Sequence, residues 1–219
     1  MKLIIALSPD GAFLLTYKTI EIKTKEYHME TILGLCIGIG LSAACGFRVF
    51  VPLLVMSIAA ILGLFEPMKG FEWLAMPSVC IALAVATVCE IAAYYIPWVD
   101  NLLDSIATPA AMIAGTLTTM AVSSGEMSQF ASWASAIIIG GGTAGAVQMS
   151  TVAVRGVSTA TTGGVANPVV STGEWIGAIL LSVLSFLIPV LVVIVLIIFA
   201  IWLARWLKNK KQTATEEPS

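Results

Sequence analysis

Five long stretches of mainly apolar residues dominate this sequence and limit what it can fold into. An α-helix needs roughly 20 apolar residues to cross the hydrocarbon core of a bilayer. Tryptophans lie near the ends of the stretches, where an amphipathic ring prefers the interface between lipid and water. The stretches cover residues 31–65, 74–97, 107–122, 131–155 and 175–205. We therefore expect an all-α fold, a polytopic transmembrane helical bundle of about five spans.

The composition supports this expectation. Hydrophobic residues make up 58% of the 219-residue chain and charged residues only 11%, whereas soluble domains are about 25% charged. A net charge of −2, with no basic patch among aromatic residues, gives no reason to expect a nucleic-acid partner. The four cysteines lie in apolar stretches without metal-ligand spacing. We expect neither a metal site nor a cofactor.

The two ends of the chain differ from its middle. The first apolar run in residues 1–28 is too short for a signal-peptide core, and the charged stretch that follows has no helical apolar stripe. We expect residues 1–28 to be an N-terminal extension outside the fold, with Met29 as the natural start. Residues 29–206 would form the transmembrane domain, and residues 207–219 a polar cytoplasmic tail.

The orientation follows from the basic residues after the last stretch. Arg205, Lys208, Lys210 and Lys211 lie there, and the positive-inside rule places such clusters in the cytoplasm. We expect a multi-pass protein of the inner (cytoplasmic) membrane with a cytoplasmic C-terminus. Counting back through five spans places Met29 outside. Arg48 and Pro52 favour a tilt, kink or break in the first stretch, and splitting that stretch would change the count.

Two stretches share a pattern of small residues and one arginine. The matched positions, at equal spacing, are Gly34, Gly38 and Arg48 in the first stretch and Gly141, Gly145 and Arg155 in the fourth. These two spans point in opposite directions in a five-span topology. The pattern therefore leads to the hypothesis of an inverted repeat with re-entrant or broken helices. Thr108-Pro109 and Asn167-Pro168 resemble helix starts that such a fold would use.

Charged residues within apolar stretches are expensive in lipid and mark candidate functional sites. Arg48 lies in the middle of the first stretch and Glu90 deep in the second. An ion pair between them would lower the cost of burying each. Two interpretations stay open, a structural pair that sets helix packing or a gating or proton-coupled carboxylate.

A polar segment separates the fourth and fifth stretches. It begins at Arg155 and ends with a predicted capping box from Ser171 to Glu174. Its candidate site residues are Arg155, Ser158, Thr159, Thr161, Thr162, Asn167 and Glu174. The segment is either an ordinary loop or a re-entrant segment lining a solute path, because irregular backbone at membrane depth is tolerated only where buried or wet.

Asp100 and Asp104 lie four residues apart, a spacing that puts both on one face of a helix. We consider them either an acidic pathway mouth or a solvated acidic loop.

Three segments carry a family resemblance: "GLSAACGFRVFVPLL", "GGGTAGAVQ" and "STATTGGVANPVVSTGE". With these motifs the sequence resembles a bacterial integral-membrane family known as domain of unknown function 4126. The resemblance covers nearly everything from about Met29 to Arg205. It implies a membrane protein of a few helices and no established substrate or reaction.

The residues themselves therefore have to indicate the function. Motifs of metalloproteases, P-loop enzymes and serine hydrolases are missing, so we do not expect an enzyme. We expect a small transporter or channel for a small polar or anionic solute. Five spans seldom enclose a pathway alone, so a homo-oligomer in the lipid bilayer is expected. The alternative is a non-transporting structural or assembly protein whose buried charges fix helix packing.

Overall fold

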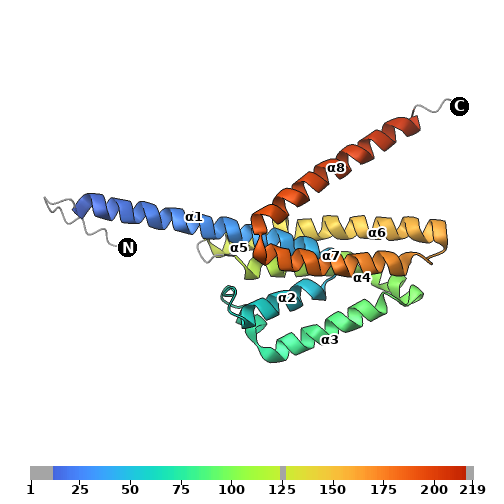
Figure 1. Cartoon of the computed structure of the whole chain (residues 1–219), viewed down its shortest axis with the longest axis horizontal. Helices are drawn as coiled ribbons and strands as arrows, with labels where there is room; N and C mark the ends of the chain where they lie inside the picture. The colour runs from blue at the N-terminus through green and yellow to red at the C-terminus, as the bar shows by residue number, and fades with distance from the viewer. Residues whose placement is uncertain (1–11, 124–126, 216–219) are drawn as a thin grey trace.

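All regular elements in the described part of the chain are helices (Figure 1). The computed structural model describes residues 12–123 and 127–215, and most side chains from Met29 to Arg205. The elements are α1 (Ala12–Cys45), α2 (Phe50–Ile61), η1 (Glu72–Ala75), α3 (Pro77–Ala93), α4 (Pro97–Ala121), α5 (Gln129–Ser135), η2 (Ala136–Gly141), α6 (Gly142–Thr162), α7 (Asn167–Leu187) and α8 (Pro189–Thr215). The expected all-α class is confirmed for these residues.

The first predicted span is split into a helical hairpin. Helix α1 ends at Cys45 and α2 begins at Phe50, so the break falls just before Pro52, close to where the sequence favoured it. The hairpin tip is buried inside the bundle, because a Cβ on Gly46 would lie 2.5 Å from the Val147 Cβ and 2.7 Å from the Ala144 carbonyl oxygen. The missing side chain at Gly46 therefore lets the tip rest directly on α6.

Helix α1 extends far beyond the bundle at its N-terminal side (Figure 1). The predicted extension of residues 1–28 falls partly on residues 1–11, which lie outside the described residues. Residues 12–28 continue α1 without a break. That the natural chain begins at Met29 stays a prediction.

Two of the predicted helix starts are wrong, and one is observed. Helix α4 begins at Pro97 and contains Pro109 in its interior, so Thr108-Pro109 starts no helix. The predicted capping box from Ser171 to Glu174 also lies inside a helix, because α7 already begins at Asn167 with Pro168 in its first turn. A glutamate in a helix interior is free to point into the bundle, and Glu174 is buried there.

The polar segment after Arg155 is mostly helix rather than loop. Helix α6 continues to Thr162 and ends at Gly163, which has a φ of 64°. That left-handed conformation suits glycine and is the common way for a helix to end. A short turn then leads into α7, so the backbone is irregular only over residues 163–166. That the segment re-enters the membrane stays a prediction.

Helices α1 and α6 run in the same direction. Gly38 on α1 and Gly140 in η2 both pack on Thr119, while Gly46 at the end of α1 packs on Val147 in α6. Both helices therefore advance together from one end of the bundle to the other (Figure 1). The opposite orientation predicted for these two spans is wrong, because the break after Cys45 adds a reversal to the chain. The last predicted span is also interrupted, at Ile188-Pro189 between α7 and α8.

Small residues let α1, α4 and η2 approach closely at the centre. Gly115 on α4 lies against Gly140 and Ala144. Ser42 on α1 donates its hydroxyl to the Gly115 carbonyl oxygen at 2.8 Å and lies 2.8 Å from the Thr119 hydroxyl. Small residues and interhelical hydroxyl contacts are the usual means by which helices associate in lipid.

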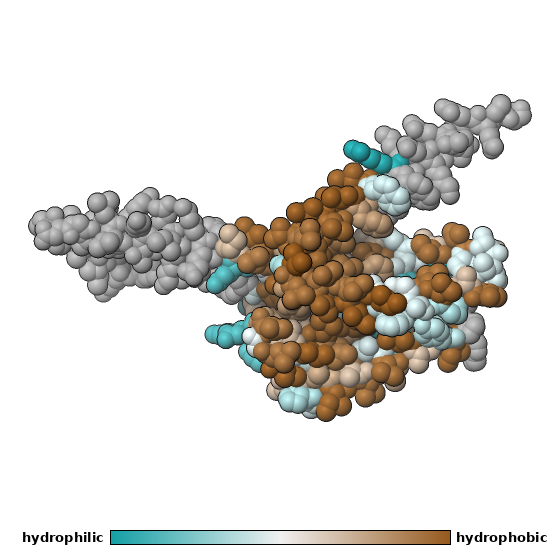
Figure 2. All heavy atoms as spheres, in the orientation of Figure 1, coloured by the Kyte–Doolittle hydropathy of each residue, from teal (hydrophilic) through white to brown (hydrophobic). Residues whose placement is uncertain are grey.

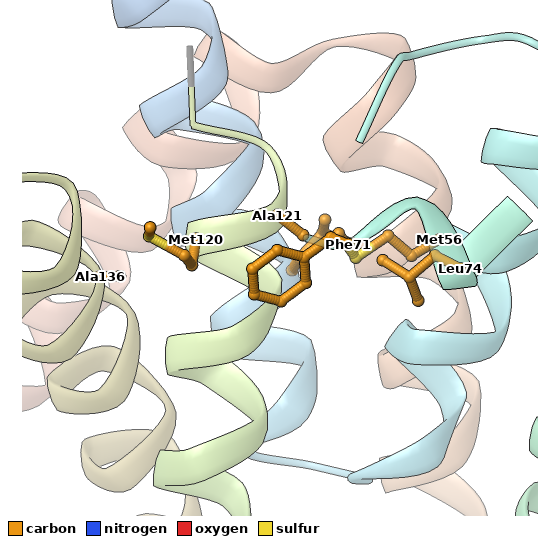
Figure 3. Close-up of a cluster of buried hydrophobic side chains, with 7 residues drawn as sticks. Met56, Phe71, Leu74, Met120, Ala121 and Ala136 are labelled. Carbon is orange, nitrogen blue, oxygen red and sulfur yellow. The ribbon is translucent and has the colours of Figure 1, made fainter. Parts of the chain in front are cut away.

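The apolar core lies at the end of the bundle that carries the α2–α3 connection. It contains Met56, Phe71, Leu74 and Met120, with the small Ala136 at its edge (Figure 3). The Met68 N–H donates to the Ala121 carbonyl oxygen at 2.9 Å, which ties the α2–α3 connection to the end of α4. A second apolar cluster contains Cys45, Leu53, Ala111, Ala114 and Ala144 and lies beside the hairpin tip.

Candidate functional site

Two buried arginines meet at one carboxylate in the other half of the bundle. Arg48, in the turn between α1 and α2, places Nη2 3.0 Å from Glu174 Oε2. Arg155 on α6 donates from Nε to Glu174 Oε1 at 3.1 Å, and its Nη2 pairs with Glu174 Oε2. The three residues are 1%, 2% and 5% exposed, so water contributes little to their solvation. Arg155 thus binds the Glu174 carboxylate through two donors, Nε and Nη2, and Arg48 adds a third contact.

A tyrosine and an aspartate complete the surroundings of Arg155. The ring centroid of Tyr94 lies 3.7 Å from the Arg48 guanidinium carbon and 4.2 Å from that of Arg155. Such cation–π contacts are strongest when the groups are desolvated, and Tyr94 is buried. Asp104 on α4 accepts from Arg155 Nη1 at 2.8 Å. The Asp104 side chain is 17% exposed and forms the outer edge of the group.

Arg48 has fewer partners than its burial demands. Its Nη2 also donates to the hydroxyl of Ser171 at 2.5 Å and to the Ser171 carbonyl oxygen at 3.3 Å. Its Nε and Nη1 atoms are buried and have no hydrogen-bond partner among the described residues. Leaving buried donors unsatisfied is costly, so these two N–H groups are positions where an acceptor would be stabilised.

Glu90 on α3 does not form the predicted ion pair with Arg48. Its carboxylate instead accepts from the backbone N–H groups of Val49 at 2.8 Å and Phe50 at 3.0 Å. These are among the first N–H groups of α2, which have no partner within their own helix. The positive end of the helix dipole also favours a carboxylate there. The prediction chose the wrong partner because it weighed only charge and depth, not the unpaired backbone at the hairpin tip.

We name the group of Arg48, Glu90, Tyr94, Asp104, Arg155 and Glu174 the charge cluster. Its residues come from the α1–α2 turn, α3, the α3–α4 turn, α4, α6 and α7. Two guanidinium groups face three carboxylates, so the cluster has one net negative charge when all are ionised. Burying charge is tolerated when partners are close and hydrogen bonds are made, which applies to all three carboxylates here.

The hydroxyl-rich end of α6 lies beyond the charge cluster and does not line it. Thr161 and Thr162 are exposed and donate to carbonyl oxygens one turn earlier, at 2.8 Å and 2.7 Å. Asn167 is buried and donates to the Thr159 hydroxyl at 3.1 Å, while Ser158 is half-buried. Arg155 lies about 10 Å from the end of α6 at 1.5 Å per residue. These polar groups thus form a rim between the cluster and the α6–α7 turn.

Of the two acidic residues predicted to form a pathway mouth, the structure describes the side chain of only one. Asp104 belongs to the charge cluster, whereas the side chain of Asp100 lies outside the described residues. Within the described residues, no group of three or more His, Cys, Asp and Glu side chains is arranged to hold a metal ion. A cavity of about 670 Å³ lies at the opposite end of the bundle, among Lys69, Trp73 and Trp133, and does not touch the cluster.

Comparison with known proteins identifies the family. A family model described as "Domain of unknown function (DUF4126)" matches residues 35–209. The chain belongs to this family. No curated protein and no solved structure matches it. The matched range contains every residue of the charge cluster, so the cluster is part of the family domain rather than of its flanks.

Sequence analysis of this family member missed two contacts of the site. Tyr94 follows Glu90 by four residues, and Ser171 precedes Glu174 by three, so each shares a helix face with a charged residue. That spacing was a usable signal. It was overlooked because Tyr94 carries no charge and Ser171 was expected to cap a helix start.

Proposed function

We propose that this family member is an integral membrane protein that binds and moves a small polar or anionic solute, with the charge cluster as its binding site. The observation that carries the proposal is the convergence of Arg48 and Arg155 on Glu174, inside an otherwise apolar bundle. Charged groups in such surroundings are expensive and mark solute or proton paths by default. The two arginines would bind an anionic or polar solute, and the carboxylates would determine which solute charge the site accepts.

Membrane insertion is supported by the outward face of the helices. In the part of the chain that the structure describes, two helices are long and apolar enough to cross a membrane, Gln129–Thr162 and Asn167–Leu187. Only 33% and 28% of their apolar windows are buried inside the bundle, whereas a core helix of a soluble protein would be mostly covered. Figure 2 shows apolar residues over most of the described body, with paler residues at the end where α6 and α7 meet. Lipid is the solvent that suits such a surface.

The α1–α2 hairpin supports a transport role. Helix α2 has 12 residues and is about 18 Å long at 1.5 Å per residue, too short to cross a bilayer core of about 30 Å. Its buried tip carries Arg48 to the charge cluster. Many transporters place solute sites where helices are interrupted, because free backbone groups and helix ends gather there. We propose that this hairpin enters the membrane and returns.

The remaining features of the proposal follow from the sequence. We propose a polytopic bundle in the inner membrane with a cytoplasmic C-terminus, on the basis of the basic residues from Arg205 onward. We also propose a homo-oligomer and no catalytic activity. The pattern shared by the first and fourth stretches would belong to a repeat of parallel rather than inverted orientation, because α1 and α6 run the same way.

The alternative function, a structural or assembly role, has one observation in its favour. Glu90 is fully engaged in capping α2, so its charge has a structural explanation. The same does not hold for Arg48, whose buried Nε and Nη1 have no partner. A group retained only for packing would be expected to satisfy its donors.

Anion flux into liposomes tests the proposed function. The purified protein is reconstituted, and vesicle swelling is followed in sodium acetate, sodium nitrate and sodium chloride, with a sodium ionophore present so that the cation can follow the anion. We expect at least one salt to enter faster than in empty vesicles, and the Arg155→Lys variant to lose that flux because lysine lacks the two-donor fork. Glu66→Gln, an exposed carboxylate outside the cluster, is the control. Equal flux in wild type and empty vesicles for all three salts would contradict the proposal.

A further inference from the structure

The geometry points to a specific solute class: we propose that the Glu174 carboxylate occupies the place of a small planar monovalent oxyanion, such as a short monocarboxylate, which binds together with one proton taken up by Glu174. This inference rests on the proposed function, because it assumes that the charge cluster is the solute site. It adds the chemistry of the solute and the ion that accompanies it.

The Glu174 carboxylate occupies the proposed anion site and indicates the size and shape of a ligand that fits there. Arg155 contacts both oxygens of the Glu174 carboxylate through Nε and Nη2, and Arg48 contacts one of them. This fork fits any planar group with two oxygens on one atom. A free carboxylate of similar size makes the same contacts once Glu174 moves aside. A larger solute would also have to displace Tyr94, whose ring lies against both guanidinium groups.

Arg48 provides the second, independent observation. Its side chain is 1% exposed, yet its Nε and Nη1 have no hydrogen-bond partner. An intramolecular carboxylate tied to α7 reaches only Nη2. A free oxyanion is not restrained by a helix backbone, so it can turn to accept from Nη2 together with either Nε or Nη1. The unsatisfied donors therefore favour a diffusible ligand over Glu174 itself.

Glu174 is the carboxylate best placed to yield. Glu90 is held by two backbone N–H groups of the α2 start and cannot leave without exposing them. Asp104 lies at the partly exposed edge and contacts Arg155 through Nη1, away from the fork. Of the described carboxylates, only Glu174 contacts both arginines. It is the group that an incoming anion must replace.

Charge balance requires the proton. Among the described residues, the charged and titratable groups around Glu174 are Arg48 from the α1–α2 turn, Arg155 from α6, Asp104 from α4 beyond Arg155, and Glu90 and Tyr94 near the end of α3. With one net negative charge already present, an added anion would leave two, at a high cost in an apolar interior. One proton from solvent on Glu174 restores the original balance. The neutral carboxyl group is then a hydrogen-bond donor to the bound anion.

The test is calorimetry of sodium acetate binding to the purified full-length protein between pH 6 and pH 8. Measuring in buffers of different ionisation enthalpy reports how many protons are taken up. We expect one proton per acetate, and an affinity that falls about tenfold per pH unit, as linkage to one proton requires. Sodium chloride, a spherical anion, should bind more weakly than acetate.

Two variants keep the inference falsifiable. Glu174→Gln mimics the neutral carboxyl group, so acetate should bind with no proton uptake and no pH dependence. Glu174→Ala should melt at a lower temperature than wild type and regain stability in acetate more than in chloride. Glu66→Gln should behave as wild type in both measurements. Acetate binding to wild type without proton uptake, or an unchanged pH dependence in Glu174→Gln, would overturn the inference.

The outcome is distinguishable from failure of the proposed function. Salt flux into wild-type liposomes without proton-linked acetate binding would remove the solute class and leave transport standing. Proton-linked acetate binding without flux of any salt would remove transport and leave the anion site. Neither flux nor binding would remove both.

Discussion

Glu90 accepts a hydrogen bond from the backbone N–H of Val49 at 2.8 Å, so a side chain on α3 caps the first turn of α2. The contact joins two helices that are separated by the whole α2–α3 connection. It also explains how a helical hairpin can end in the interior of an apolar bundle, because a helix start there needs an acceptor for its N–H groups.

Removing that acceptor should destabilise the hairpin. We expect Glu90→Ala to lower the free energy of unfolding by about 2–6 kcal/mol, because two N–H groups lose a charged partner, each at about 1–3 kcal/mol. Glu90→Gln should cost less, since one oxygen remains. Thermal unfolding in detergent measures both, with Glu66→Gln as the control. If Glu90→Ala melts like the control, the capping role is wrong.

Arg155 should be the most sensitive position of the charge cluster. Arg155→Ala leaves Asp104 and Glu174 with one cation fewer, and breaking a buried pair costs about 3–5 kcal/mol. Asp104→Asn should cost less than Arg155→Ala, because it removes one contact of Arg155 and leaves the two-donor fork to Glu174 in place. Chemical unfolding of both variants measures which one loses more unfolding free energy. A larger loss for Asp104→Asn than for Arg155→Ala would contradict the assigned geometry.

Gly46 should tolerate no side chain, unlike other glycines of the helices it contacts. A Cβ there would meet Val147 at 2.5 Å, so we expect Gly46→Ala to cost about 1–3 kcal/mol through overpacking. Gly142→Ala is the matched control in α6, where nothing lies within 4 Å of an added Cβ, and it should be neutral or stabilising by up to about 1 kcal/mol. Similar melting temperatures for both variants would show that the tip does not rest on α6.

Lipid should shield one exposed position and not another. Met149 in the middle of α6 is 63% exposed and Val165 in the α6–α7 turn is 82% exposed, so water would reach both equally in a soluble protein. In a variant without native cysteines, we expect a membrane-impermeant maleimide added to both sides of the membrane to label Val165→Cys and not Met149→Cys. Detergent denaturation should make both reactive. Equal labelling before denaturation would argue against membrane insertion.

The predicted stretches agree with the helices where one local signal decided the outcome. Apolar length indicated α3 and the continuous helix from Gln129, and Asn167-Pro168 indicated the start of α7. The predictions were wrong where two sequence signals competed for the start of the same helix. Thr108-Pro109 was a plausible helix start, but Pro97 already begins that helix twelve residues earlier. The break between α7 and α8 at Pro189 lay hidden in the most apolar run of the chain.

The candidate site shows the same division. The sequence identified Arg48, Glu90, Asp104, Arg155 and Glu174 because charge is conspicuous in apolar surroundings. It could not assign their partners, since a pairing depends on which helix faces lie together. Sequence proximity misled in the hydroxyl-rich segment, where helix α6 carries its threonines past Arg155 and away from the carboxylate.

The sequence by itself determined the helical class, the family and the residues whose burial needs an explanation, because composition and apolar length act within each segment. The tertiary structure alone decided that α1 and α6 run parallel, that Glu90 caps α2, and that Arg48 and Arg155 share Glu174. Those outcomes depend on the reversal after Cys45 and on the close approach of glycine-bearing helices. Both are properties of the packed chain, in which each buried polar group takes the partner that packing brings within reach.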